Sequence, residues 1–253
     1  MKLSSALFYE GFRFFLGPVA ELAFRISSEG ADNVPESGPG IIVANHRCYL
    51  DPLILALSVQ RLINFAAGSH LYSFPGAAAV LRLPGFFPMH IYGGTEGDRS
   101  LEEASRLLSD GELIGIFPEG IESFMNIDRA SLISEFKTGF VRVAIENRVP
   151  IIPAAIIGLV EKELVKLPGA LVKPFVKHPR ASEGVMLVNY TRVRCRIGMP
   201  LDLSPYHGEP LTKDLMDRVA ARVRQVVVKL YEGNDLERIM TGEAPFNFAQ
   251  DSL

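Results

Sequence analysis

Short apolar runs that stop at polar residues mark the first half of the chain. Residues 41–44 (IIVA) lead to His46, and residues 112–117 (ELIGIF) lead to Glu119. Continuous apolar runs of this length are typical of strands buried on both faces of a sheet. A polar turn and a helical pattern follow each run, which indicates parallel strands, and ligands of parallel sheets bind at the carboxyl ends of the strands. We therefore expect His46 and Glu119 to lie on one rim.

The remaining pattern indicates an α/β protein. Residues 212–231 place their apolar positions on one stripe, which is typical of a helix packed on the core. Residues 71–88 are interrupted by proline and glycine, so we expect short helical turns and loops there. The predicted class is a single α/β domain with a central, mostly parallel sheet flanked by helices, plus an N-terminal amphipathic helical segment. Further strands are predicted at 65–67, 149–156 and 187–198, and further helices at 52–60, 100–110 and 137–147.

Both ends of the chain differ in pattern from the α/β domain predicted at residues 29–233. Residues 1–28 carry more apolar side chains than one helix face needs, which is typical of helices in a membrane interface; the alternative is packing on the domain itself. The glycine and proline at 17–18 should break or kink this helix. Residues 161–180 mix lysines with apolar side chains, which fits either contact with anionic lipid headgroups or a solvated loop. Residues 234–253 are expected to form an irregular tail.

Composition restricts the location and the class of partner. The 253 residues are 48% hydrophobic and 22% charged with a net charge of −3, so no bulk positive charge favours nucleic acid. The mean hydropathy is +0.19, yet no apolar run reaches the roughly 20 residues of a spanning helix. The N-terminus lacks the pattern of a secretory signal. These features favour a cytoplasmic protein that is peripheral on the inner face of the cell membrane.

The two cysteines provide neither a disulfide framework nor a metal site. Cys48 and Cys195 are far apart and show no metal-ligand spacing, which fits a reducing compartment. His46 lies two residues from Cys48, but no second cluster completes a zinc set. We therefore expect no metal.

The histidine at the end of the first strand has a carboxylate five residues later. In a strand-turn-helix, Asp51 could hydrogen-bond the His46 imidazole, fix its tautomer and stabilise its charged form, so that the pair could draw a proton from a hydroxyl. The alternative is structural, because an aspartate before Pro52 is a good helix N-cap. A histidine near a strand end could likewise have a purely structural role, as a hydrogen-bond partner of a backbone carbonyl.

A glycine-rich stretch at residues 93–97 (GGTEG) offers two other chemistries, and neither fits well. It lacks the Gly-Lys-Ser/Thr ending of a phosphate-binding loop, so a plain connection before a helix that starts at the capping box Ser100–Glu103 is the better interpretation. The chain contains no Gly-x-Ser-x-Gly, which argues against a serine hydrolase.

Three blocks in order resemble a known family. Residues 45–51 (NHRCYLD), 117–120 (FPEG) and 149–153 (VPIIP) are similar to the blocks of the phospholipid/glycerol acyltransferase superfamily of the PlsC type, which includes the lysophosphatidate acyltransferases. The resemblance spans about residues 30 to 200. It implies acyl transfer from a coenzyme A or acyl-carrier-protein thioester to a hydroxyl, usually on a lysolipid, at a membrane surface and without a cofactor.

The resemblance also implies roles for individual residues. His46 would be the general base, Asp51 would orient it, and the thiolate would be protonated by His46, so that no covalent acyl-enzyme is needed. Glu119 would hydrogen-bond acceptor hydroxyls, and Gly120 would allow close backbone approach. Backbone amides near His46 or Gly120 are candidate oxyanion donors. Further substrate-binding residues implied by the blocks are Asn45, Phe117, Pro118 and, for the acyl chain or donor, Pro153.

The chain departs from the family where a phosphate would bind. The third block usually continues with an arginine that contacts the acceptor phosphate, but this chain has Glu122 there, so the sign of the charge is reversed. The second block usually has an arginine as well, and here only His90, or Arg99 further on, could substitute for it. We infer that a lysolipid with a zwitterionic, amino-acid or sugar headgroup is an alternative acceptor to lysophosphatidate.

Two other functions stay open from the residues alone. A thioesterase or lipase-like hydrolase would use water in place of the acceptor at His46. A lipid-binding or scaffolding protein would use the fold without catalysis.

Overall fold

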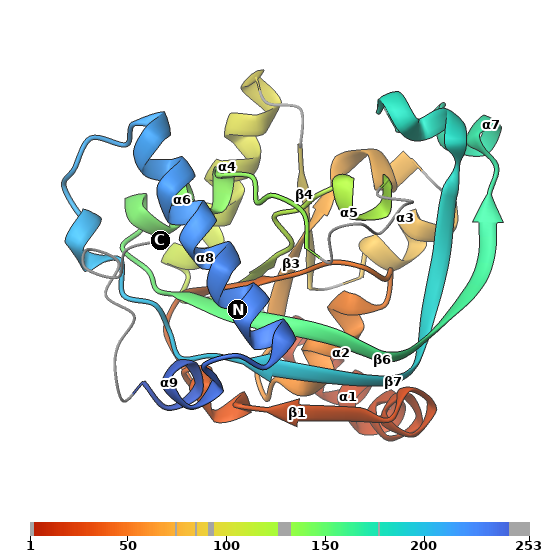
Figure 1. The fold of residues 1–253 in the computed structure, drawn as a ribbon, viewed down its shortest axis with the longest axis horizontal. Coiled ribbons are helices and arrows are strands. Elements are labelled where there is room, and N and C mark those ends of the chain that lie inside the picture. Colours follow the sequence, from red (N-terminus) through yellow and green to blue (C-terminus); the bar gives the residue numbers. More distant parts are fainter. Residues whose placement is uncertain are drawn as a thin grey trace.

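A seven-stranded sheet forms the centre of the computed structural model, which describes residues 3–242 apart from 74, 84, 91–93, 126–132 and 177 (Figure 1). The strands are β1 (Ile26–Glu29), β2 (Gly40–Ala44), β3 (Ile63–Gly68), β4 (Phe86–Met89), β5 (Leu113–Ile116), β6 (Ile151–Leu167) and β7 (Val185–Ile197). The α-helices are α1 (Leu3–Phe24), α2 (Asp51–Ser58), α3 (Pro75–Leu81), α4 (Gly94–Ser109), α5 (Glu122–Met125), α6 (Gly139–Glu146), α7 (Gly169–Val172), α8 (Lys213–Glu232) and α9 (Leu236–Thr241). Short 3-10 helices are η1 (Ala31–Asn33), η2 (Ser69–Ser73), η3 (Pro179–Glu183) and η4 (Ser204–Tyr206).

The strand order is β1-β7-β6-β2-β5-β3-β4, and it confirms a mostly parallel sheet. The five strands β2 to β6 are parallel to one another. Strand β7 is antiparallel to β6, and β1 pairs with β7 in parallel. Val43 of β2 is level with Ile116 of β5 on one side and Pro153 of β6 on the other. The carboxyl ends of β2 and β5 therefore reach the same rim together.

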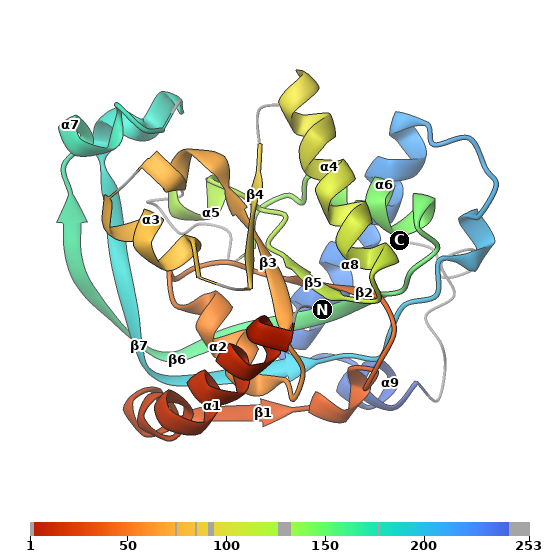
Figure 2. The same cartoon turned by 180° about the vertical axis from the view of Figure 1, so that it is seen from behind.

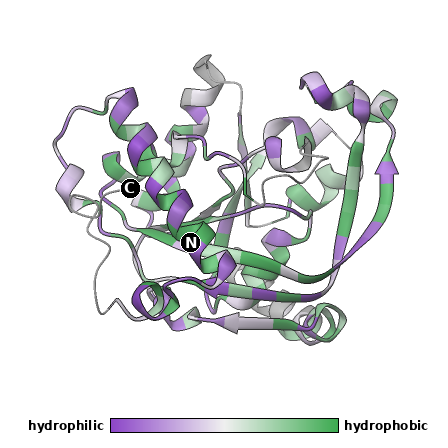
Figure 3. Ribbon diagram, in the orientation of Figure 1, coloured by the Kyte–Doolittle hydropathy of each residue, from purple (hydrophilic) through white to green (hydrophobic). Residues whose placement is uncertain are grey.

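Both faces of β2 are buried, which explains its uninterrupted apolar sequence. Ile41 and Val43 pack with residues of α4, α6 and α8, whereas Ile42 and Ala44 pack with residues of α2. Helix α8 lies in front of the sheet in Figure 1, and α1 and α2 lie in front of it in the opposite view of Figure 2. The apolar face of α8 turns toward the sheet and its polar face outward, as the hydropathy colours indicate (Figure 3). The predicted α/β domain, with a mostly parallel sheet flanked by helices, is thus confirmed.

The N-terminal segment differs from its predicted organisation in two respects. Helix α1 continues through Pro18 without a break, and Gly17 lies against Leu57 of α2, so part of α1 packs on the domain. The chain then enters β1, an edge strand beside β7, so the boundary predicted at residue 28 falls inside the sheet. The described helices include none that is both long enough and apolar enough to span a bilayer.

Two further predictions need correction. Helix α4 starts at Gly94 instead of Ser100, and the Ser100 hydroxyl accepts a hydrogen bond from the His90 amide at 2.8 Å, so this serine stabilises the preceding turn instead of capping the helix. Helix α9 interrupts the predicted irregular tail because Ile239 is buried and its carbonyl accepts from the Met199 amide at 2.8 Å. Residues 243–253 lie outside the described residues.

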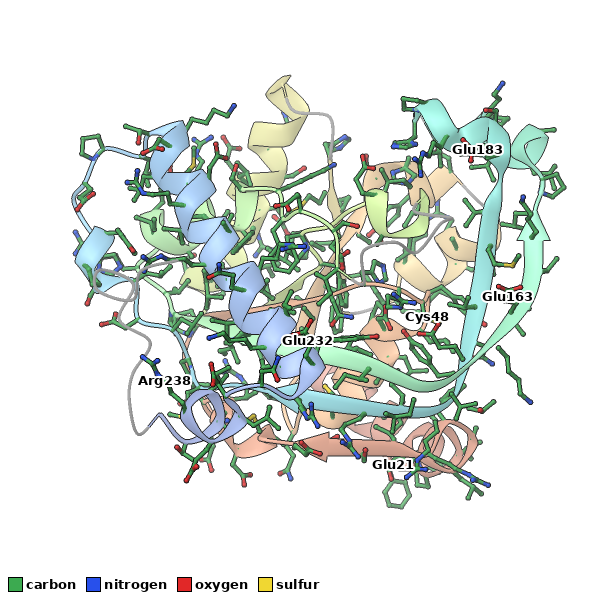
Figure 4. The ribbon with its side chains drawn as sticks, viewed as in Figure 1. Glu21, Cys48, Glu163, Glu183, Glu232 and Arg238 are labelled. Carbon is green, nitrogen blue, oxygen red and sulfur yellow. The ribbon has the colours of Figure 1, made fainter. Side chains whose placement is uncertain are left out.

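Strands β6 and β7 continue beyond the sheet as a two-stranded arm, formed by residues 157–192. In Figure 4 the labels Glu163 and Glu183 mark this arm, and Cys48 lies near its bend. The tip, with α7 and η3, has a small apolar core to which Ile121 contributes. The 161–180 segment therefore begins as strand, up to Leu167, and the tip reaches back to the chain that follows β5.

Candidate active site

A buried side-chain amide determines where β2 ends. Asn45 is fully buried, its Nδ2 donates to the carbonyl of Ile156 at 2.9 Å, and its Oδ1 accepts from the Ile156 amide at 2.8 Å. The side chain thus pairs with the backbone of β6 in place of a further strand residue. The chain leaves the sheet at the next residue, His46. Asn45 positions the site and is too enclosed to contact a substrate directly.

Asp51 is the centre of the hydrogen-bond network that follows. It is fully buried, and its Oδ2 accepts from the amides of Arg47 at 2.7 Å and Cys48 at 2.8 Å and lies 2.8 Å from His46 Nδ1. The residue that caps α2 is Leu50, without a side-chain bond, so the alternative role of Asp51 as N-cap does not apply. The carboxylate instead closes the turn and fixes the histidine with the same oxygen.

The His46 ring is fixed through Nδ1, which lies 2.8 Å from Asp51 Oδ2. Because an ionised carboxylate only accepts, the His46–Asp51 bond requires the proton on Nδ1, which makes Nε2 the basic nitrogen. The ring stacks on Phe117 with a centroid distance of 4.4 Å and an interplanar angle of 23°. Its side chain is 16% exposed. An oriented, partly accessible imidazole of this kind can accept a proton from a bound hydroxyl.

A tyrosine that the sequence pattern did not reveal completes the network. Tyr190 of β7 is buried, and its hydroxyl donates to Asp51 Oδ1 at 3.0 Å. Burial, reinforced by the Asp51 charge, raises the pKa of Tyr190, so the hydroxyl remains a donor. Burial likewise raises the pKa of Cys48 to about 12, and its thiol donates to the Val188 carbonyl. Cys48 is therefore a protonated packing residue and a poor nucleophile.

Replacing Tyr190 tests its contribution to the network. Tyr190→Phe removes one donor and leaves Asp51 Oδ1 buried without it, so we expect the free energy of unfolding to fall by about 1–3 kcal/mol. Activity should fall by less than about tenfold, because the bond to His46 uses the other oxygen. Urea denaturation and initial rates measure both effects. Tyr49→Phe is the control, since Tyr49 lies in the turn between His46 and Asp51 but is 48% exposed. Equal losses in the two variants would contradict the role of Tyr190.

Glu119 connects three segments at the rim. It is 1% exposed; its Oε1 accepts from the His46 amide at 2.7 Å and its Oε2 from the Ser134 amide at 2.6 Å. Burial raises the pKa of Glu119, and the two amide bonds partly offset this effect. A buried carboxylate with two backbone partners stabilises the position of the histidine. Contact with acceptor hydroxyls stays a prediction for its remaining lone pairs.

The backbone amides predicted as oxyanion donors already have partners. The amides of His46, Arg47 and Cys48 donate to Glu119 or Asp51, and the amide of Gly120 donates to the Phe117 carbonyl at 3.2 Å. That prediction is therefore wrong for these four amides. Gly120 has a φ of +62°, in the left-handed region that favours glycine, so its role in a tight turn is clear.

The other predicted site residues lie at different distances from His46. His90 follows β4, on the same rim but three strands from β2, which places it about 14 Å away at ordinary strand spacing, and its Nδ1 lies 3.0 Å from Ser69 Oγ. Arg99 is exposed on α4. Pro153 is buried in β6 level with Val43, one residue before the end of β2, and its burial makes it a core residue.

Glu122, the departure from the family pattern, points to the arm. Its carboxylate oxygens both lie 3.2 Å from Nε2 of His178, next to η3. This pair joins the start of α5 to the tip of the arm. No group of three or more His, Cys, Asp or Glu side chains within the described ranges is arranged to hold a metal ion.

Comparison with known proteins agrees with the fold and the blocks. The model of the family described as Acyltransferase matches residues 25–157, which include β2, β5, His46, Asp51 and Glu119 but not Tyr190. The crystal structure of the 1-acyl-sn-glycerophosphate acyltransferase PlsC from Thermotoga maritima superposes with a TM-score of 0.54 over 89% of this chain and 82% of that one. At 20% identity, this likeness concerns the fold.

Curated relatives cover most of the chain. An uncharacterised protein of Mycobacterium tuberculosis is 28% identical over 234 residues, 83% of this chain, and the match spans 63% of that protein's length. A 1-acyl-sn-glycerol-3-phosphate acyltransferase of Borreliella burgdorferi is 24% identical over 204 residues, 81% of this chain and 74% of that protein. With the family model matching more than half of its residues, this chain belongs to the acyltransferase family of the PlsC type.

Proposed function

We propose that this protein is an O-acyltransferase that moves a fatty acyl group from a thioester of coenzyme A or acyl-carrier protein to a hydroxyl of a lysolipid. The observation that carries the proposal is the Asp51–His46 pair, 2.8 Å apart, at the rim of an acyltransferase-family fold. The donor and the lysolipid are substrates, and no cofactor takes part.

The geometry supports a direct transfer. Nε2 of His46 takes the proton of the acceptor hydroxyl as its oxygen attacks the thioester carbon, and Asp51 stabilises the imidazolium that forms. The tetrahedral intermediate then expels the thiolate, which takes the proton from His46, so the enzyme returns to its starting state. General-base assistance of this type contributes roughly 10²–10⁴-fold, and positioning of the two substrates contributes further.

An acceptor screen tests the proposal. Purified protein is incubated with radiolabelled long-chain acyl-CoA or acyl-carrier protein and a panel of lysolipids, with His46→Ala as the control. Labelled diacyl lipid from the wild type alone supports acyl transfer. Labelled free fatty acid alone, formed equally without lysolipid, would instead favour the hydrolase alternative.

We further propose peripheral association with the inner face of the cell membrane through α1. The side chains of Phe15, Val19 and Leu22 follow one another at helical spacing and are between 64% and 81% exposed. Apolar side chains on an exposed helix face are typical of helices in a membrane interface. Gly17, on the opposite side, packs on α2. Both predicted roles of α1 are thus compatible, with one face on the domain and the other available to lipid.

Charged substitutions on α1 test this association. The double variant Phe15→Glu/Leu22→Glu removes two large apolar groups, each worth about 1.5–3 kcal/mol when buried, so binding to anionic vesicles should fall by at least about tenfold. Co-sedimentation with vesicles measures the effect. Val80→Glu on α3, 53% exposed, is the matched control. Unchanged binding of the double variant would remove α1 as the membrane contact.

A further inference from the structure

The charge reversal at Glu122 does not determine the charge of the rim. Glu122 is paired with His178, and both oxygens of Glu119 accept backbone amides. Glu122 is thus paired with the arm, and Glu119 holds the backbone of two neighbouring segments. A cation elsewhere could still bind an anionic group there.

Lys137 is such a cation. A Cβ built on Gly120 would lie 3.4 Å from Lys137 Nζ, 3.6 Å from Cε and 3.9 Å from Cδ, so the end of the lysine side chain lies across the glycine of the turn. Gly120 directly follows Glu119, which bonds the His46 amide. The ammonium group is therefore held at the rim that carries the base.

Backbone hydrogen bonds place Lys137 at this position. Its amide donates to the Pro118 carbonyl at 3.0 Å, and Ser134, three residues earlier, donates to Glu119. Arg224 of α8 donates to the carbonyls of Ser134 at 2.9 Å and Ile133 at 2.6 Å. The segment that carries the lysine is thus fixed to both the turn and α8, while the lysine side chain itself is exposed.

The positive charge of Lys137 is available to bind an anionic group. Among the described residues, no carboxylate forms an ion pair with it. A lysine ammonium binds phosphate as a point charge, and an exposed one suits a group that remains partly in water, such as a lipid headgroup. It suits a buried oxyanion poorly, because solvent weakens its field.

We propose that Lys137 binds the phosphate of a phosphomonoester lysolipid and so makes such a lipid the preferred acceptor. This inference rests on the proposed acyl transfer. Lys137 would supply the positive charge that Glu122 does not, from a segment downstream of the FPEG turn. The substrate hydroxyl then lies toward His46 and the headgroup toward Lys137.

The test compares acceptors and donors in one enzyme. Rates are measured with lysophosphatidate and with monoacylglycerol of the same chain, at varied acyl-CoA, for wild type, Lys137→Gln, Lys137→Arg and the control Lys213→Gln. Lys213 is an exposed lysine at the start of α8. In Lys137→Gln, we expect the KM for lysophosphatidate to rise about tenfold or more, with kcat, the KM for acyl-CoA and the monoacylglycerol rate within about twofold. Lys137→Arg should restore most of the loss.

Other outcomes overturn the inference in distinguishable ways. A higher KM for acyl-CoA alone would assign the lysine to a phosphate of the donor. An equal loss of kcat with every acceptor would indicate a structural or oxyanion role. An unchanged preference for lysophosphatidate in Lys137→Gln would remove Lys137 as the phosphate ligand, with acyl transfer intact. If the wild type acylates no acceptor, the proposed function itself fails.

Discussion

His46→Ala should lower kcat by about 10²–10⁴-fold with little change in stability. The variant removes the imidazole that Asp51 orients, but it keeps the backbone amide that donates to Glu119 at 2.7 Å. The Glu119 link between the two strand ends therefore survives, and the loss should be chemical. Initial rates at saturating acyl-CoA and lysolipid, with urea denaturation of the same samples, separate the two effects.

A second histidine provides the control for this result. His207→Ala changes a histidine that directly follows η4. This histidine is far from His46 in sequence and does not belong to the network around Asp51. Its activity should stay near that of the wild type. Near-wild-type activity of His46→Ala as well would contradict the base assignment and favour a binding or scaffolding role.

Asp51→Asn should impair both activity and stability. Three donors converge on Oδ2 of Asp51. If the asparagine places its amide nitrogen there, two donors face two backbone N–H groups. If it places its amide oxygen there, its nitrogen faces the Tyr190 hydroxyl, which donates in the wild type. We expect a loss of about 3 kcal/mol or more in the free energy of unfolding, because a buried network is left partly unsatisfied.

The same substitution should reduce kcat roughly 10²–10⁴-fold at a temperature where the variant is folded, because His46 loses the partner that fixes its tautomer. Circular dichroism identifies that temperature, and rates are measured below it. Asp110→Asn, a surface change beside Arg106, should alter stability by less than about 1 kcal/mol. Wild-type rates from folded Asp51→Asn would show that the carboxylate only closes the turn.

The parts of the fold predicted from sequence are those whose pattern has one physical cause. Strand β2 is apolar throughout because successive residues face two different cores, and α8 has a clear stripe between Thr212 and Gly233, which cap it. Strands β1 and β4 were missed because they are short, lie at the edges and include residues such as Ser27 and Pro88 that rarely mark strands.

The candidate site was predictable where its residues are close in sequence or, as with His46 and Glu119, closely follow parallel strands. His46 and Asp51 are five residues apart, so a turn alone can join them. Tyr190 is 139 residues from Asp51 and comes to it only through the antiparallel pairing of β7 with β6, which no local pattern specifies. The same applies to Lys137, whose place depends on the backbone pairing with Pro118.

Acyl transfer to lysolipid, with His46 as base, is tested most directly by following the labelled acyl group. Wild type and His46→Ala are incubated separately with radiolabelled acyl-CoA, with and without lysophosphatidate. The lipid products of each sample are then separated. We predict labelled phosphatidate from the wild type only when the lysolipid is present, with free coenzyme A in equal amount and at least about a hundredfold less from His46→Ala. Equal release of free fatty acid with and without lysolipid, or equal phosphatidate from both proteins, would contradict the account.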